Sequence, residues 1–144
     1  MNKLPTPLES AEQATFVQWL DLMGLKHTSI PNSTYTTSIK QKMHNKRQGL
    51  HAGLPDVLVV IPNKGLLFVE LKRRKGGVVS EAQRDWIAAL NTVAGVEARV
   101  CAGSDMAIAF VGEFYHKTRA IFKLPDLLDL DPELLKTIDI DNMF

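Results

Sequence analysis

Residues 56–72 of the sequence are DVLVVIPNKGLLFVELK. The run over 57–61 is continuous and rich in β-branched side chains, which is typical of a strand buried on both faces. Residues 62–65 have the composition of a turn, and residues 66–72 are predicted to return as a second strand. The stretch therefore predicts a β-hairpin.

A helix and a further strand follow this hairpin. Ser80 is placed to cap a helix over 80–94, and Gln83 has the spacing of a capping box. Residues 96–101 are predicted to form a strand, and a strand–helix–strand crossover of this kind makes its two strands parallel. Ser104 then caps a last helix.

Two elements and a loop precede the hairpin. Thr6-Pro7-Leu8-Glu9 has the pattern of a capped helix start, and apolar residues at helical spacing follow it. Glu12 lies one turn before Phe16, so its carboxylate is expected near the core side of this helix. A short strand is predicted over 25–30, and a basic loop and helix over 33–49. The order predicts an α/β fold with a small mixed sheet flanked by helices on both faces.

Length and composition exclude several classes of protein. The chain has 144 residues, which is about one domain with a sizeable core. Its 45% hydrophobic and 23% charged residues argue against a disordered chain. No apolar run reaches the length of a membrane span, and the N-terminus lacks a signal-peptide pattern. The single Cys101 excludes an internal disulfide and a zinc site built on thiolates. These features predict a cytoplasmic protein with no membrane partner.

Charge is unevenly distributed along the chain. Residues 1–124 carry 16 Lys/Arg against 10 Asp/Glu, whereas residues 125–144 carry one against six. We therefore predict one domain over 1–124 with an acidic amphipathic extension over 125–144. Two basic clusters are expected to contact the phosphates of a nucleic acid, and solvated surface patches are the alternative. The clusters are Lys40, Lys42, Lys46 and Arg47, and Arg73, Arg74 and Lys75.

The hairpin also gathers charged groups. Side chains two apart on a strand share a face, so Glu70 and Lys72 project together. With the turn centred on 63–64, Asp56 lies opposite Leu71, and a slip of one residue still leaves it beside Glu70. Two carboxylates, an ammonium group and the Leu71 carbonyl oxygen thus meet at one end of the sheet. Mg²⁺ or Mn²⁺ needs such oxygen donors and would assist phosphodiester hydrolysis. The alternative is a surface hairpin with an ordinary Glu–Lys pair.

Three motifs, in this order, resemble those of a known family. Gly53-Leu54-Pro55-Asp56, FVELK over 68–72 and SEAQRDW over 80–86 resemble the virus-type replication-repair nuclease (VRR-NUC) domain. This domain is a branch of the PD-(D/E)xK nuclease superfamily. IPN over 30–32 fits the same pattern. The resemblance covers roughly residues 8–105 and implies a restriction-endonuclease-like core.

The resemblance implies a role for each matching residue. Asp56 and Glu70 would be metal ligands, and Lys72 would be the catalytic lysine. Glu12 would be an accessory acid on the first helix, and Gln83 a further active-site residue. The capping role of Gln83 is the alternative to this last assignment.

These observations predict an endonuclease that depends on Mg²⁺ or Mn²⁺ and needs no small-molecule cofactor. By resemblance to stand-alone phage VRR-NUC proteins, its partner would be branched DNA such as a Holliday junction, in the host cytoplasm if the protein is encoded by a phage. Two symmetric cuts need two sites, so a homodimer is expected. Its interface would use apolar residues that could instead complete the core of one chain: Phe110, Phe114, Tyr115, Ile121 and Phe122. A catalytically silent DNA-binding module and a non-selective nuclease are the alternatives.

Overall fold

The computed structural model describes residues 7–31 and 38–121, with side chains described as far as His116. The elements follow the predicted order. They are α1 (Glu9–Leu22), β1 (His27–Ser29), α2 (Ile39–Arg47), β2 (Val57–Ile61), β3 (Gly65–Lys72), α3 (Glu81–Leu90), β4 (Val96–Ala102) and α4 (Ser104–Ile121). No helix in these ranges is long and apolar enough to cross a membrane. The acidic extension predicted over 125–144 lies outside the described residues.

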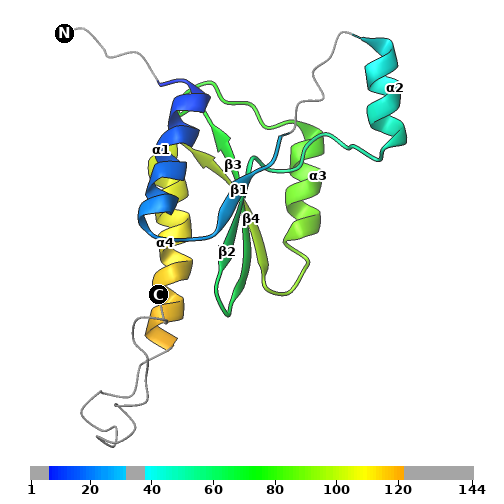
Figure 1. Cartoon of the computed structure of the whole chain (residues 1–144). Coiled ribbons are helices and arrows are strands. Elements are labelled where there is room, and N and C mark those ends of the chain that lie inside the picture. Colours follow the sequence, from blue (N-terminus) through cyan, green and yellow to red (C-terminus); the bar gives the residue numbers. More distant parts are fainter. Residues whose placement is uncertain (1–6, 32–37, 122–144) are drawn as a thin grey trace, which may run out of the picture.

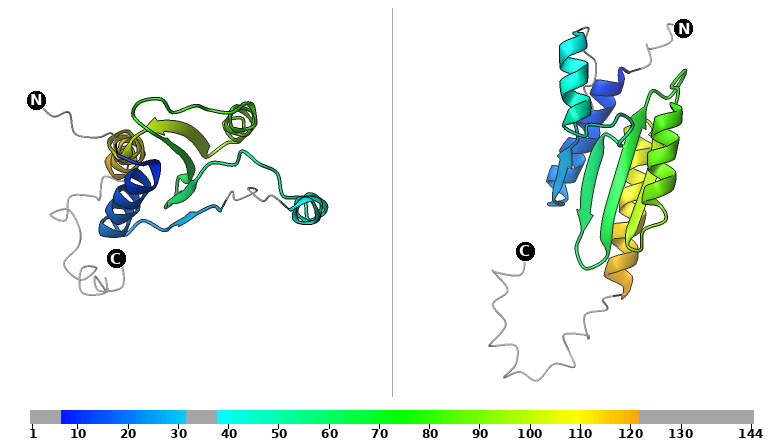
Figure 2. Two further views of the ribbon diagram at one scale, coloured as in Figure 1. Left: turned by 90° about the horizontal axis from the view of Figure 1, so that it is seen from above. Right: turned by 90° about the vertical axis from the view of Figure 1, so that its right-hand side faces the viewer.

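The strands of the described chain form one sheet in the order β1-β2-β3-β4. β2 is antiparallel to both β1 and β3, whereas β4 is parallel to β3, as the crossover through α3 predicts. α1 and α4 cover one face of the sheet and α3 covers the other, while α2 stands apart (Figures 1 and 2). This mixed sheet between helices confirms the predicted α/β fold.

The hairpin register differs by one residue from the predicted one. Val57 pairs with Val69, and Ile61 pairs with Gly65. The turn therefore has three residues instead of four. The Lys64 N–H donates a hydrogen bond of 3.1 Å to the Ile61 carbonyl, and Asn63, the third residue of this β-turn, has φ of 60°, which Gly and Asn tolerate best at that position. Because successive side chains of a strand alternate between faces, even this small shift decides which residues meet across the pair.

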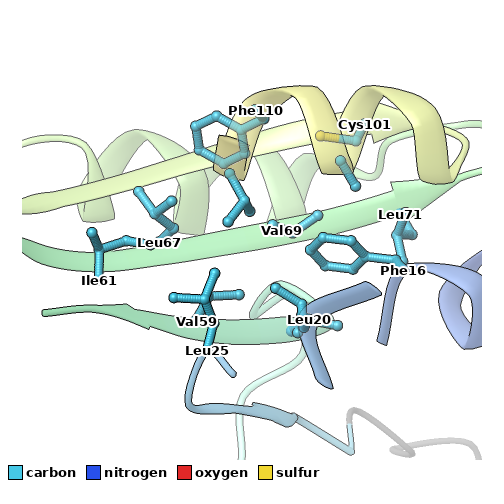
Figure 3. Packing of buried hydrophobic residues seen from close by; sticks show 13 residues of the cluster. Phe16, Leu20, Leu25, Val59, Ile61, Leu67, Val69, Leu71, Cys101 and Phe110 are labelled. Carbon is cyan, nitrogen blue, oxygen red and sulfur yellow. The ribbon is translucent and has the colours of Figure 1, made fainter. Parts of the chain in front are cut away.

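The hydrophobic core lies between the sheet and the α1–α4 pair (Figure 3). Its largest fully buried side chains include Phe16, Leu20, Val57, Val59, Val69, Leu71 and Phe110. On the opposite face of β2, Leu58 and Val60 are only half-buried. The predicted burial of this strand on both faces is therefore wrong, because α3 packs against β4 and leaves β2 partly open.

Two helix starts differ from the predicted caps. α1 begins at Glu9 after Leu8, whose side chain makes no cap hydrogen bond, and the predicted cap Thr6 lies outside the described residues. Ser104 is the first residue of α4, and its hydroxyl donates a hydrogen bond to Glu12. The start of α4 is thus tied to α1 by a tertiary contact.

The aromatic residues of α4 pack against the core of their own chain. Phe110 is 2% exposed, and Phe114 and Tyr115 are partly buried against the same cluster. The side chain of Ile121 and the whole of Phe122 lie outside the described part of the chain. The first three residues therefore do not supply the surplus apolar surface from which an interface was predicted.

Candidate functional site

Charged side chains gather at the end of the sheet where β2 begins and β3 ends. The observed register, extended by one residue, sets Asp56 opposite Glu70 and not opposite Leu71. Opposite residues of an antiparallel pair share a face, so both carboxylates lie on the face that α3 covers. Lys72 lies on the same face, two residues further along β3. The structure thus brings these three side chains together.

The loop before β2 is held against α3. Gly53 has φ of +104°, and a Cβ atom there would lie 2.6 Å from the backbone of Ala82. Glycine is required by both the conformation and the close approach. The Trp86 indole N–H also donates a hydrogen bond of 3.1 Å to the carbonyl of Ala52. The glycine of the Gly-Leu-Pro-Asp motif therefore serves to position Asp56.

Glu70 is almost completely buried, with 1% of its surface exposed. Its Oε1 accepts hydrogen bonds from Lys72 Nζ at 2.7 Å and from Gln83 Nε2 at 2.5 Å. Among the described residues, no donor reaches its Oε2. A buried polar atom without a partner is costly and calls for an explanation, of which an absent ion is one.

Gln83 performs two structural tasks at once. Its side-chain oxygen accepts a hydrogen bond from the Ser80 backbone N–H, and its backbone N–H donates one to the Ser80 hydroxyl oxygen, which completes the predicted capping box. Its side-chain NH₂ group donates to Glu70. The two alternatives considered for this residue are therefore compatible, because an amide side chain has both an acceptor and donors.

Asp56 is fixed by the backbone of the neighbouring strand. Its Oδ2 accepts a hydrogen bond of 2.9 Å from the Leu71 N–H. The N–H and carbonyl of one residue in an antiparallel strand point to the same side, so the Leu71 carbonyl is also directed toward Asp56. Asp56 therefore lies directly beside the Leu71 backbone, which supplies the third oxygen predicted from the sequence.

Burial raises the pKa of both carboxyl groups. For Asp56, burial is the largest cause, and the Leu71 N–H and the Lys72 charge oppose it. Burial also dominates for Glu70, where the Lys72 hydrogen bond opposes it and the charge of Asp56 adds to it. Burial lowers the pKa of Lys72, but the hydrogen bond and charge of Glu70 outweigh it and raise this pKa overall. Two carboxylates whose charged forms are disfavoured make this a favourable place for a cation.

The donor set fits a hard divalent cation. In the described ranges, no group of three or more His, Cys, Asp or Glu side chains is arranged to hold a metal ion. Asp56 and Glu70 supply two carboxylates, Leu71 a carbonyl oxygen, and the unpartnered Glu70 Oε2 has lone pairs to offer. Mg²⁺ commonly takes one or two carboxylates and completes its shell with water and substrate phosphate. The residues present therefore suit such an ion.

Glu12 has a different environment from the one that the resemblance implies. It is 3% exposed, and its oxygens accept hydrogen bonds from the Arg74 side chain and from the backbone N–H and hydroxyl of Ser104. These bonds lower the pKa of Glu12 to about 2, the hydrogen bond from Arg74 being the largest cause. The contacts join α1, α4 and the segment after β3.

A second acid of α1 was not singled out from the sequence. Glu9 acts electrostatically on Asp56, Glu70 and Lys72, where its charge raises each pKa. It lies one turn before Glu12 in the first turn of the helix. Helical periodicity places both acids on neighbouring turns, but it does not tell which of them acts on the charged cluster.

The cations of the two basic clusters differ in whether they pair with acidic side chains. The cations of α2 are all exposed, as are Arg73 and Lys75 after β3. Arg74 instead donates to Glu12 at 2.7 Å and to Asp105 at 2.8 Å. Its guanidinium group is therefore engaged within the protein, unlike those of its neighbours.

Comparisons with known proteins agree with this geometry. A model of the VRR-NUC domain family matches residues 4–105. A solved structure described as a VRR-NUC domain protein has the same fold, with a TM-score of 0.65 and 22% sequence identity over 78% of this chain and 92% of that one. No curated protein matches the chain.

Proposed function

The chain belongs to the VRR-NUC domain family, which indicates a nuclease of the PD-(D/E)xK type, and we propose that it is a metal-dependent endonuclease that cuts branched DNA. The proposal assigns Mg²⁺ or Mn²⁺ as the ion and a four-way junction as the preferred substrate. The observation that carries the metal site is the buried Glu70 Oε2, which has no partner among the described residues and lies beside a second carboxylate.

The residues of the cluster have separate tasks in this proposal. Asp56, Glu70 and the Leu71 carbonyl would hold the ion, which supplies Lewis-acid polarisation of the phosphate and a more acidic bound water. Lys72 would place its ammonium group beside the reacting phosphate and offset the negative charge that develops there. Gln83 would fix the orientation of Glu70 through its side-chain N–H. Water is consumed and one P–O bond of the backbone is broken.

We assign the accessory acid of α1 to Glu9. The resemblance gives this role to Glu12, whose oxygens are occupied by Arg74 and Ser104. Glu9 instead contributes its charge at all three members of the cluster. Comparing Glu9→Gln with Glu12→Gln tests this: the first should slow cleavage, whereas the second should act on stability.

The exposed cations of α2 and of the segment after β3 would contact DNA phosphates near the site. Such contacts make affinity fall with salt, and each lost contact flattens that dependence. Neutralising the α2 cations, or Arg73 with Lys75, should therefore weaken binding to all DNA sequences. Arg74→Gln should change the salt dependence less, because Arg74 is engaged with Glu12 and Asp105. The cations concerned in α2 are Lys40, Lys42, Lys46 and Arg47.

Cleavage of a labelled four-way junction, next to a linear duplex built from the same arm sequences, tests the proposal. Both DNAs are incubated with Mg²⁺, with Mn²⁺ and with EDTA, and Asp56→Asn serves as the matched inactive protein. Junction cutting that needs the ion and exceeds duplex cutting is expected. Binding without cutting would identify a silent DNA-binding module, and equal cutting of both DNAs a non-selective nuclease.

A homodimer follows from the same proposal. A four-way junction has near-twofold symmetry, and one chain with one site cannot place two symmetric cuts in a single encounter. Light scattering at micromolar concentration should give about twice the mass of the chain. A mass of one chain, with and without junction DNA, would contradict paired cutting.

A further inference from the structure

Helix α2 presents an unusual surface for an isolated element. None of its nine residues is buried, and two of its aliphatic side chains are largely open to solvent. Ile39 is 75% exposed and Met43 is 53% exposed. They are four residues apart, so they lie next to each other on one face of the helix. Exposed aliphatic side chains gathered on one face can mark an interaction site.

The cations of α2 surround this pair. With 100° per residue, the four Lys and Arg side chains all lie within about 80° of the line midway between Ile39 and Met43. Lys42 and Lys46 fall on one side of it, and Lys40 and Arg47 on the other. The opposite face has no Lys or Arg and contains His44 together with Gln41 and Asn45, which are joined by a hydrogen bond of 2.9 Å. Positive charge and aliphatic surface are thus combined on a single face.

The chemistry of that face selects its partner. Four cations with no acidic residue in the helix favour a polyanion, and two aliphatic side chains favour an apolar surface framed by that charge. A linear duplex stacks its base faces away from solvent, whereas a branch point or unpaired step exposes them between two rows of phosphate. Ile and Met are among the side chains that proteins insert at such steps.

The position of α2 agrees with this choice. Figures 1 and 2 show α2 to the side of the sheet, past α3, at the level of the end where β2 begins and β3 ends, which is the end that holds Asp56 and Glu70. The chain runs from α2 directly into the loop that carries Asp56. DNA lying across this end of the sheet would meet the candidate site and α2 together.

We propose that the Ile39–Met43 face of α2 packs against base surfaces exposed at a branch point, while the flanking cations hold the adjacent phosphates. This inference rests on the proposed function and adds the element that recognises the branch. The aliphatic pair would supply the preference for branched DNA, and the cations would supply affinity for any DNA.

The test compares binding of two DNAs by the full chain in EDTA. The variant Ile39→Gln/Met43→Gln removes the aliphatic surface and keeps a good helix former at each position. Gln41→Ala/Asn45→Ala is the matched control on the opposite face. The aliphatic variant should lose about tenfold in affinity for the four-way junction, a typical cost for losing contact with a base, and less than about twofold for the linear duplex. The control should bind both as the wild type does.

A base analogue gives a second readout. 2-Aminopurine at the branch point becomes more fluorescent when it is unstacked. The wild type and the control variant should raise this signal, and the aliphatic variant should not.

Several outcomes would overturn the inference. The inference is wrong if the aliphatic variant loses affinity equally for both DNAs or for neither. It is also wrong if that variant changes only the oligomeric mass of the protein, or only its binding to phosphatidylserine vesicles. Failure of the proposed function is distinct, because it is measured as cleavage by the wild-type protein in Mg²⁺, whereas this inference is measured as binding in EDTA. No residue of α2 is buried, so both variants should unfold at the same temperature as the wild type. This measurement checks that they fold.

Discussion

Two glutamates are buried in the described part of the chain, and their surroundings are opposite. Glu12, on α1, has hydrogen-bond donors at both oxygens, from Arg74 and Ser104. Glu70, on β3, has Lys72 and Gln83 at one oxygen, and no donor among the described residues at the other. The pKa of Glu12 is lowered to about 2 by its hydrogen bonds, whereas burial raises the pKa of Glu70.

The difference teaches that burial of a carboxylate does not by itself mark a functional group. A buried carboxylate with all its lone pairs satisfied holds elements together, and here it joins α1 to α4 and to the segment after β3. A buried carboxylate with one oxygen that lacks a donor among the described residues has lone pairs to offer to a ligand. We therefore expect substitutions at Glu12 to affect stability, and substitutions at Glu70 to affect chemistry.

The largest expected effect is loss of cleavage in Asp56→Asn and Glu70→Gln. Loss of groups that merely support a metal ligand costs roughly 10–100-fold in activity, so loss of a ligand should cost at least about 100-fold. DNA binding in EDTA should be unchanged, because neither substitution removes a phosphate contact. Cleavage rates in Mg²⁺ and binding of Mn²⁺ by calorimetry provide the measurements. Near-normal cleavage by either variant would show that the site is assigned wrongly, and near-normal cleavage by Glu70→Gln would leave no functional difference between Glu70 and Glu12.

Glu12→Gln should have the next largest effect, on the free energy of unfolding. Breaking a fully buried ion pair costs about 3–5 kcal/mol, and we expect about 2–3 kcal/mol here because the Arg74 side chain is 40% exposed. Urea unfolding in EDTA measures it. In the same assay Glu70→Gln should cost less than Glu12→Gln, because the loss of its ion pair with Lys72 is offset by the removal of a charge that burial disfavours.

Arg74→Gln is the matched variant for this prediction. Its cost and that of Glu12→Gln should not add in the double variant, because both break the same contact. Full additivity would show that the two side chains stabilise the fold independently.

The pH dependence of the unfolding free energy should also distinguish Glu12 from Glu70. The pKa of Glu12 is lower in the folded state, about 2 against an ordinary 4.5, so its contribution is complete above pH 4.5. That contribution is lost as the pH falls toward 2. The difference in unfolding free energy between wild type and Glu12→Gln should therefore shrink across this window. Glu70 has the opposite sign, because its raised pKa favours the protonated form in the folded protein.

Urea titrations of both proteins at several pH values across the window give this difference. A difference that stays constant down to pH 2 would mean that the charge of Glu12 does not carry its contribution.

The surroundings of Glu70 depend on local pattern, and the sequence predicted them. The two strands of the hairpin placed Glu70 and Lys72 on one face, and the register needed correction by only one residue. In the observed turn Asn63 adopts the left-handed conformation. A turn of three residues and one of four are both compatible with the same letters, so pattern alone could not choose between them.

The surroundings of Glu12 were beyond the sequence because its partners are distant. Periodicity correctly predicts that Glu12 lies near the core, but its donors Arg74 and Ser104 are 62 and 92 positions away. Arg74 lies in a run of four basic residues, and from the sequence it was therefore predicted to contact DNA like its neighbours. Only the folded chain shows that it is paired with an acid while the cations beside it are exposed.

The smallest expected effect concerns Gln83. It donates a side-chain hydrogen bond to the buried Glu70, as Arg74 does to the buried Glu12. Gln83→Ala removes both its cap on α3 and its hydrogen bond to Glu70. Loss of one capping contact costs about 1 kcal/mol, and loss of a group that orients a ligand costs about tenfold in activity. Ser80→Ala removes the other half of the capping box but leaves the Gln83 side chain beside Glu70. We therefore expect the two variants to lose similar stability, while only Gln83→Ala loses cleavage rate. Urea unfolding and junction cleavage of both proteins decide this, and equal cleavage by the two would reduce Gln83 to a helix cap.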